Sequence, residues 1–141
     1  LQALIDEYSP AFFSRIGLRY INVIRRSVLG LDGVDWTELL KPHILGVLAS
    51  PEVGKHIQSF ETKHEIRLAD GDSIVRVTTK LAKPVDDDEA CYVIDSDFFR
   101  PAKTEVDATM QKLDYLHARA SRLIRWCITD RLHQAMDPEK L

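Results

Sequence analysis

The sequence is poor in the residues that mark extracellular, fibrous or membrane-spanning proteins. Its 141 residues include only 2 cysteines, 6 glycines and 6 prolines. No apolar run approaches the roughly 18 residues that a membrane helix needs, and no leader of the secretory type opens the chain. We therefore expect neither a disulfide scaffold nor a collagen-like repeat. We expect a soluble, cytoplasmic protein without a membrane partner.

A strong excess of charge of one sign is also missing. The chain carries 19 Lys and Arg against 22 Asp and Glu, a net charge of -3, so no global positive field recruits nucleic acid. Cys91 and Cys127 stand far apart, and none of the 5 histidines has metal-ligand spacing. We expect no metal, no cofactor and no complete catalytic set, although an enzyme is not excluded.

The chain begins with Leu1 rather than Met, and residues 1–9 already follow a helical spacing of apolar side chains. We interpret residues 1–141 as a single domain, and as a fragment that lacks an N-terminal portion. Residues 12–25 then alternate between apolar and polar, which predicts a half-buried strand. A short helix is expected to follow, capped by Asp35 or Thr37 and extending to Leu40.

The pair Asp70-Gly71 predicts a tight hairpin turn between strands at residues 57–69 and 72–83. With a two-residue loop, opposed residue numbers sum to 141, so Ile66 faces Val75 and Glu65 faces Arg76. Apolar pairs then lie on one face and opposite charges on the other. A slip of one residue would destroy both patterns, so this register is well specified.

Residues 91–99 predict a further strand, and residues 106–136 predict one long amphipathic helix. The expected fold class is α+β: an antiparallel sheet of about four strands in the order β-α-β-β-β-α, with the C-terminal helix on one face. The helix would span about 45 Å. It therefore either runs along the strands or projects and packs against another chain or against the missing N-terminal portion.

Four short blocks carry a family resemblance. They are Arg15-Ile-Gly-Leu-Arg-Tyr-Ile-Asn22, Leu113-Asp-Tyr-Leu-His117 and Ile128-Thr-Asp130, with Ile94-Asp-Ser-Asp97 between the first two. The chain resembles the C-terminal half of a sporadically distributed family of uncharacterised bacterial proteins. The resemblance implies a bacterial, intracellular protein, and it brings no activity, cofactor or catalytic residue with it.

Four polar side chains are candidates for lining a cleft between the sheet and the helix: Tyr20, Asn22, His64 and His117. Asn22 interrupts an apolar row, and His64 faces Val77 on the apolar side of the hairpin. The competing interpretation for both is a structural hydrogen bond within the core.

Charged residues suggest two further sites. Arg131 falls within the apolar arc of the predicted helix, which predicts a buried or interfacial ion pair with Asp95, with Asp97 or with a second subunit, unless the helix frays there. Arg119, Arg122 and Arg125 recur every three residues beside Trp126 and could hold a phosphate backbone. A solvated helix flank is the plainer interpretation of this stripe, and we do not expect nucleic-acid binding from an acidic chain.

Three functions remain open at this point. The leading hypothesis is a non-enzymatic interaction or assembly module, such as a homo-oligomer. Its grounds are a predicted helix too long for its sheet, a start that reads as truncated and the lack of a complete catalytic set. The alternatives are a small-ligand-binding domain with a cleft between sheet and helix, and nucleic-acid binding through the arginine stripe.

Overall fold

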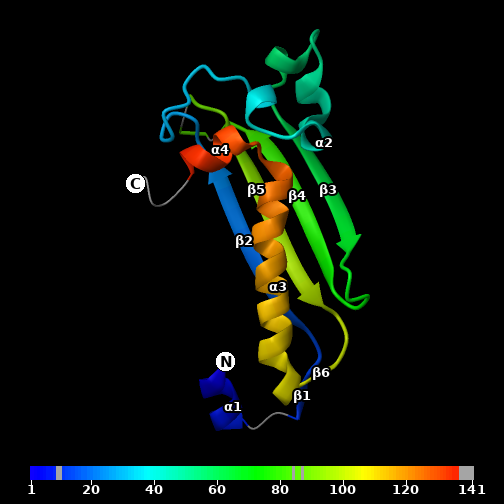
Figure 1. Ribbon diagram of the computed structural model, residues 1–141. Helices are drawn as coiled ribbons and strands as arrows, with labels where there is room; N and C mark the ends of the chain where they lie inside the picture. The colour runs from blue at the N-terminus through cyan, green and yellow to red at the C-terminus, as the bar shows by residue number, and fades with distance from the viewer. Residues whose placement is uncertain (9–10, 84, 87, 137–141) are drawn as a thin grey trace.

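A computed structural model describes residues 1–8, 11–83, 85–86 and 88–136 of the chain. Its main element is a four-stranded antiparallel sheet with the strand order β2-β5-β4-β3, crossed on one face by a long helix, α3 (Figure 1). The strands are β2 (Ile16–Ile24), β3 (Phe60–Arg67), β4 (Ile74–Ala82) and β5 (Cys91–Arg100), and the helix is Val106–Cys127. The predicted α+β class and the antiparallel four-stranded sheet are confirmed.

The hairpin of β3 and β4 has the predicted register. Ile66 pairs with Val75, and Glu65 pairs with Arg76. The turn is longer than expected, because the strands end at Arg67 and begin again at Ile74 rather than closing on a two-residue loop. Gly71 has a φ of 80°, a value that favours glycine.

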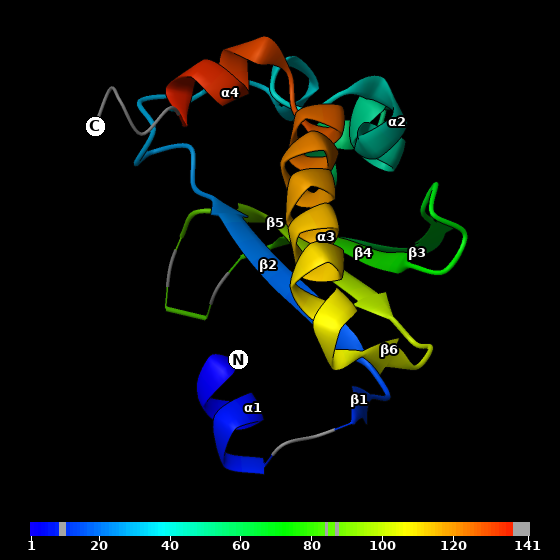
Figure 2. The same cartoon turned by 60° about the horizontal axis from the view of Figure 1, so that its bottom comes forward.

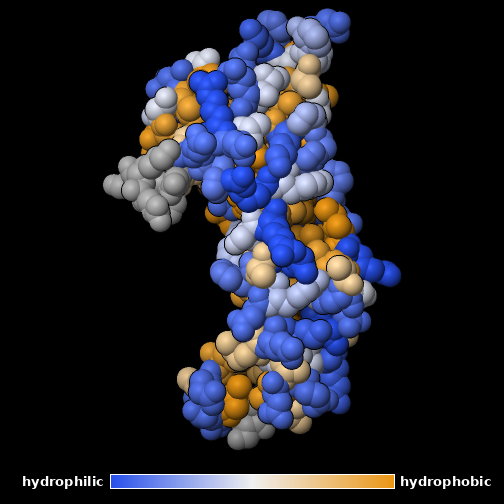
Figure 3. Space-filling model, in the orientation of Figure 1, coloured by the Kyte–Doolittle hydropathy of each residue, from blue (hydrophilic) through white to orange (hydrophobic). Residues whose placement is uncertain are grey.

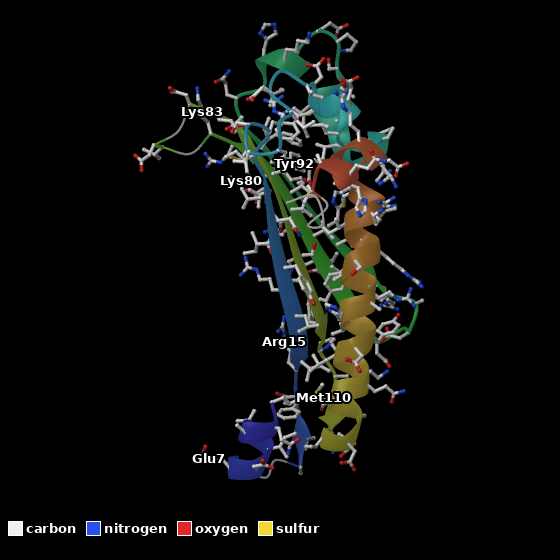
Figure 4. The ribbon with its side chains drawn as sticks, turned by 60° about the vertical axis from the view of Figure 1, so that its left-hand side comes forward. Glu7, Arg15, Lys80, Lys83, Tyr92 and Met110 are labelled. Carbon is white, nitrogen blue, oxygen red and sulfur yellow. The ribbon has the colours of Figure 1, made fainter. Side chains whose placement is uncertain are left out.

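The face of the sheet under α3, here called the inner face, is organised in rows that cross all four strands. Strand pairing aligns Leu18, Phe98, Val75 and Ile66 in one row, and Tyr20, Ser96, Val77 and His64 in the next. The alternation of side chains along a strand therefore brings residues from four separate segments to one surface. In Figure 4, Tyr92 lies on the helix side of the sheet and Lys80 on the opposite side.

The C-terminal helix is shorter than predicted. α3 ends at Cys127, and a separate helix, α4 (Asp130–Ala135), follows after a break at Ile128 and Thr129. The break is fixed by pairing with a distant segment, since Ile128 bridges Leu40 and the Thr129 amide donates to the Leu39 carbonyl. The prediction of one helix over residues 106–136 is thus wrong at its C-terminal end.

The 22 residues of α3 span about 33 Å, close to the length of the 9-residue strand β2 at about 3.3 Å per residue. The helix runs along the strands (Figure 1), which agrees with one of the two predicted alternatives. Its apolar face lies within its own chain, with Leu116 fully buried and Ala120 only 8% exposed.

Short elements close the upper end of the inner face (Figure 1). They are the turns η1 (Trp36–Glu38), η2 (Gly46–Ala49) and η3 (Gly54–His56), together with the helix α2 (Pro42–Leu45). The short helix expected between Asp35 and Leu40 is thus a single 3-10 turn, and Asp35 stands at its N-cap without a side-chain cap. Leu39 and Leu40 are completely buried there in the main core cluster.

Two features at the other end complete the fold. The helix α1 (Gln2–Tyr8) agrees with the predicted helix over residues 1–9, whose last residue lies outside the described part of the chain. The strands β1 (Phe12–Phe13) and β6 (Thr104–Glu105) form a second sheet of two strands. The single predicted strand over residues 12–25 is therefore two strands, of which only β2 belongs to the main sheet.

Candidate functional site

A groove lies where α3 leaves part of the inner face uncovered. The helix contacts β2 and β5, whereas β4 and β3 extend out from beneath it on one side (Figure 2). The space between helix and strands has a volume of about 350 Å³. We call it the α3 groove, and the residues that line it are Ile66, Leu68, Val75, Phe98, Arg119, Arg122, Leu123 and Trp126.

The lining follows from the periodicity of the elements. Phe98, Val75 and Ile66 belong to one row of the inner face, on β5, β4 and β3. The four lining residues of α3 stand at positions i, i+3, i+4 and i+7, so they share the helix face that is turned towards β3. In the space-filling view, hydrophobic residues gather beside the upper half of α3 (Figure 3).

Six of the eight lining residues are apolar, and the other two are the arginines. No carboxylate of the described residues lines the groove. Arg119 places its guanidinium 4.8 Å from the centre of the Tyr115 ring, and its Nε is buried without a hydrogen-bond partner among the described residues. Arg122 is exposed and forms no ion pair with any residue that the structure describes. The groove therefore combines an apolar floor with two positive charges that form no ion pair with any described residue.

Trp126 is held at the end of the groove nearest to α2. Its ring centre lies 4.2 Å from that of His43, and His43 Nε2 donates to the Trp126 carbonyl oxygen at 2.7 Å. The indole is nevertheless 45% exposed. An aromatic side chain that is fixed yet accessible is suited to contact with an apolar ligand.

The four residues predicted to line a cleft are not all brought together. Tyr20 Oη and His117 Nδ1 lie 2.7 Å apart, between β2 and α3. His64 occupies the opposite end of the row that starts at Tyr20, three strand spacings away, or about 14 Å. Asn22 lies on the inner face of β2, in the next row. The predicted cleft is thus divided, and the groove lies on the His64 side of the helix.

His64 is exposed rather than part of the core. Its pairing with Val77 is as predicted, but β3 is the edge strand of the sheet, and the helix contacts β2 and β5 instead. The alternation identified the correct face of the strand. It carried no information on how far the helix covers that face.

The predicted ion pair of Arg131 with Asp95 or Asp97 is wrong. Arg131 pairs with Glu38 at 3.0 Å, and both side chains are more than half exposed. Asp95 and Asp97 lie on the outer face of the sheet and pair there with Arg19 and Arg15. The hydrogen bond from Arg19 lowers the pKa of the Asp95 carboxyl.

The three arginines of the predicted nucleic-acid stripe have different surroundings. Arg119 and Arg122 line the groove, whereas Arg125 pairs with Asp130 at 2.9 Å. Nucleic-acid binding by all three remains a prediction.

Sequence reasoning missed the apolar members of the site. The hairpin register already paired Ile66 with Val75, but it did not place Phe98 in the same row. That placement requires the pairing of β4 with β5, which are joined by a loop without a recognisable turn signal. Leu123 and Trp126 read as ordinary residues of an amphipathic helix, since nothing in their spacing shows which side of the helix stays uncovered.

Two hollows near the loops at the other end of the sheet share Arg26, Ile57 and Ala90. Their volumes are about 420 and 530 Å³, and side chains of both charge signs line them. Arg26 is already occupied there, because it donates to the Val34 carbonyl at 2.7 Å and lies over the Trp36 ring. The lining of these hollows is therefore less apolar than that of the α3 groove, and its charges have both signs.

The rest of the described chain shows no metal site, no reactive thiol and no membrane-spanning helix. No three His, Cys, Asp or Glu side chains converge as metal ligands among the residues described. Both cysteines are free and buried, and burial raises the pKa of the Cys127 thiol to about 11. No helix in these ranges combines the length and the apolar character that would let it cross a membrane.

Comparison with known proteins leaves the site without a precedent. No family model matches the chain, and neither a curated protein nor a solved structure is similar to it. Function is therefore inferred from the geometry of the molecule.

Proposed function

We propose that this domain is a non-enzymatic binding module that takes a small, mainly apolar molecule into the α3 groove. The observation that carries the proposal is the pairing of a 350 Å³ hollow with a lining that is apolar at six of eight positions. Small-molecule sites are typically concave, mostly apolar hollows of about 300 to 1,000 Å³ with a few placed polar groups.

The floor of the groove is preformed. Phe98 and Val75 are each 1% exposed, so their positions are fixed by the core beneath them. Ile66 and Trp126, by contrast, are 37% and 45% exposed and have apolar surface left to bury. A ligand in the groove would gain about 25 cal/mol for each Å² of apolar surface that it removes from water.

This proposal keeps the predicted ligand-binding alternative and changes its residues. One of the three grounds for an assembly module is a predicted helix too long for its sheet. The helix ends at Cys127, and Leu116 and Ala120 on its apolar face are buried within the same chain. A partner chain is therefore not needed to cover that face.

The test is a titration with N-phenyl-1-naphthylamine, an uncharged dye that becomes fluorescent in apolar sites. We expect saturable binding by the wild-type domain, and a loss of affinity of at least about tenfold in Ile66→Glu, which places a charge against the apolar floor. Met110→Glu is the matched control, because Met110 is 55% exposed near the start of α3 and does not line the groove.

Circular dichroism of both variants establishes that they are folded. Equal dye binding by Ile66→Glu and Met110→Glu would place the dye elsewhere and refute the proposal. Absence of any saturable binding by the wild-type domain would refute it as well.

One observation still favours assembly as a second candidate. The outer face of the sheet is covered by no helix of the described chain, and it exposes Ile21 and Val23 at 57% each. Light scattering on the eluting peak of a gel filtration column tests this candidate. This candidate is refuted if the wild-type domain is a monomer at high protein concentration and Ile21→Asp has the same mass.

The setting of this function also remains a prediction. The resemblance to uncharacterised bacterial proteins and a cytoplasmic location are compatible with a domain whose two cysteines are free.

A further inference from the structure

We infer that the ligand of the α3 groove is a single-chain amphiphile with an anionic end, a carboxylate or a phosphate, which Arg119 and Arg122 hold. This inference rests on the proposed function and adds the chemical class of the ligand. The inference follows from three observations: the charge of the groove, the lack of ion-pair partners for its two arginines among the described residues, and the length of its apolar part.

The charge of the groove has one sign. Its two charged lining residues are both arginines, in a chain whose net charge is -3. The neighbouring cation on the helix, Arg125, is neutralised by Asp130, while Arg119 and Arg122 have no carboxylate partner among the described residues. An anion is the complementary ligand, and an amine of the same chain length would be repelled.

The geometry of Arg119 adds a second argument. Its Nε is buried without a partner, and an unpaired buried donor costs free energy that a bound acceptor restores. The guanidinium is also held in place, because it lies 4.8 Å from the Tyr115 ring centre and the Tyr115 hydroxyl accepts from the Asp70 amide. A fixed guanidinium can donate two parallel hydrogen bonds to a carboxylate or a phosphate.

The apolar part has the length of a medium alkyl chain. From Arg119 to Trp126 the helix rises seven residues, or about 10 Å at 1.5 Å per residue. An extended chain of roughly eight to ten carbons, joined by bonds of about 1.5 Å in a zigzag, covers this distance. With its charged end at Arg119 and Arg122, such a chain would run over Leu123 and reach Trp126.

The experiment is displacement of N-phenyl-1-naphthylamine by four probes of equal chain length: decanoate, decyl phosphate, decanol and decylamine, each below its micelle-forming concentration. We expect at least one of the two anions to compete at least about tenfold more strongly than decanol, as expected for charge-assisted hydrogen bonds in a partly apolar site. Decylamine should compete least. The relative strength of decanoate and decyl phosphate identifies the anionic group.

The variant Arg119→Gln/Arg122→Gln should lose most of the preference for the anions while it still binds decanol. Arg125→Gln is the matched control: it makes the same substitution on the same helix at a residue outside the groove, and its preference should equal that of the wild type. Arg119→Gln and Arg122→Gln are also measured singly, so the result does not depend on the folding of the double variant.

The outcomes separate this inference from the proposed function. If decanol competes as strongly as the anions, or if the double variant keeps the preference for them, the ligand class is wrong while the groove remains a binding site. If neither the dye nor any probe binds the wild-type domain, the proposed function itself fails.

Discussion

Asp70 closes the β3–β4 hairpin through its carboxylate, and its removal gives a sharp test of how the sheet is stabilised. One carboxylate oxygen accepts from the amides of Asp72 and Ser73, at 3.1 and 2.9 Å, and the other accepts from Ser73 Oγ at 2.6 Å. Ser73 is only 1% exposed. In Asp70→Ala, the two donors of Ser73 therefore lose their partner in a place that water hardly reaches.

The expected cost follows from these contacts. A hydrogen bond to a charged group contributes about 1.5 to 3 kcal/mol, and a buried donor left unpaired costs about 1 to 3 kcal/mol. Because the turn can relax towards solvent, we expect a loss of about 2 to 3 kcal/mol in the free energy of unfolding. Urea denaturation followed by circular dichroism measures it as a shift of the midpoint at constant slope.

The effect should depend on pH in a defined direction. Burial by itself would raise the pKa of Asp70, but the hydrogen bonds from Ser73 and Asp72 outweigh it, so the pKa lies below its ordinary value of 3.8. A carboxylate with a lowered pKa stabilises the fold above its ordinary pKa, and this contribution disappears as the pH falls through the lowered value. The difference between wild type and Asp70→Ala should therefore be full at pH 7 and shrink below about pH 4.

Asp72→Ala is the control, since Asp72 lies in the same turn and its side chain, 54% exposed, pairs with Arg100 at 2.8 Å. Arg100 is only 15% exposed, but it keeps its hydrogen bond to Thr104 Oγ1 at 2.9 Å, so the loss of the Asp72 carboxylate should cost about 1 kcal/mol. The reasoning is refuted if Asp70→Ala costs no more than Asp72→Ala, or if its cost is the same at pH 3 and pH 7.

Three further predictions concern the C-terminal region. Thr129→Ala should lower the free energy of unfolding by about 1 kcal/mol, because Thr129 Oγ1 caps α4 at the Leu132 amide and donates to the Glu38 carbonyl at 2.8 Å; an unchanged urea midpoint would contradict this. Arg131→Gln should cost less than about 1 kcal/mol, since its pair with Glu38 is exposed, and a loss above 3 kcal/mol would instead indicate a buried pair. Cys127, fully buried with its pKa raised to about 11 by burial, should resist a thiol reagent at pH 8 until denaturant is added, and rapid labelling of the folded protein would contradict this.

Much of the fold could be predicted because its signals are local. The register of the β3–β4 hairpin follows from the alternation around Asp70-Gly71, and it was correct for every pair from Arg67 and Ile74 outwards. The apolar spacing over residues 106–136 predicts an amphipathic helix, and Leu116 and Ala120 on the apolar face of α3 are buried. These features depend on contacts between residues that are close in sequence or that a single turn aligns.

The sequence by itself thus determined which side of β2, of the β3–β4 hairpin and of α3 is apolar, and with it the fold class. Only the tertiary structure decided what each apolar side meets. The bridge between Leu40 and Ile128 ends α3, the pairing of β4 with β5 brings Phe98 beside Val75, and the position of α3 over β2 and β5 leaves the groove open beside Ile66. The physical reason is that the periodicity of an element sets the direction in which each side chain points. Which segment then covers or pairs with that element depends on residues far away in the sequence, and no local pattern encodes that choice.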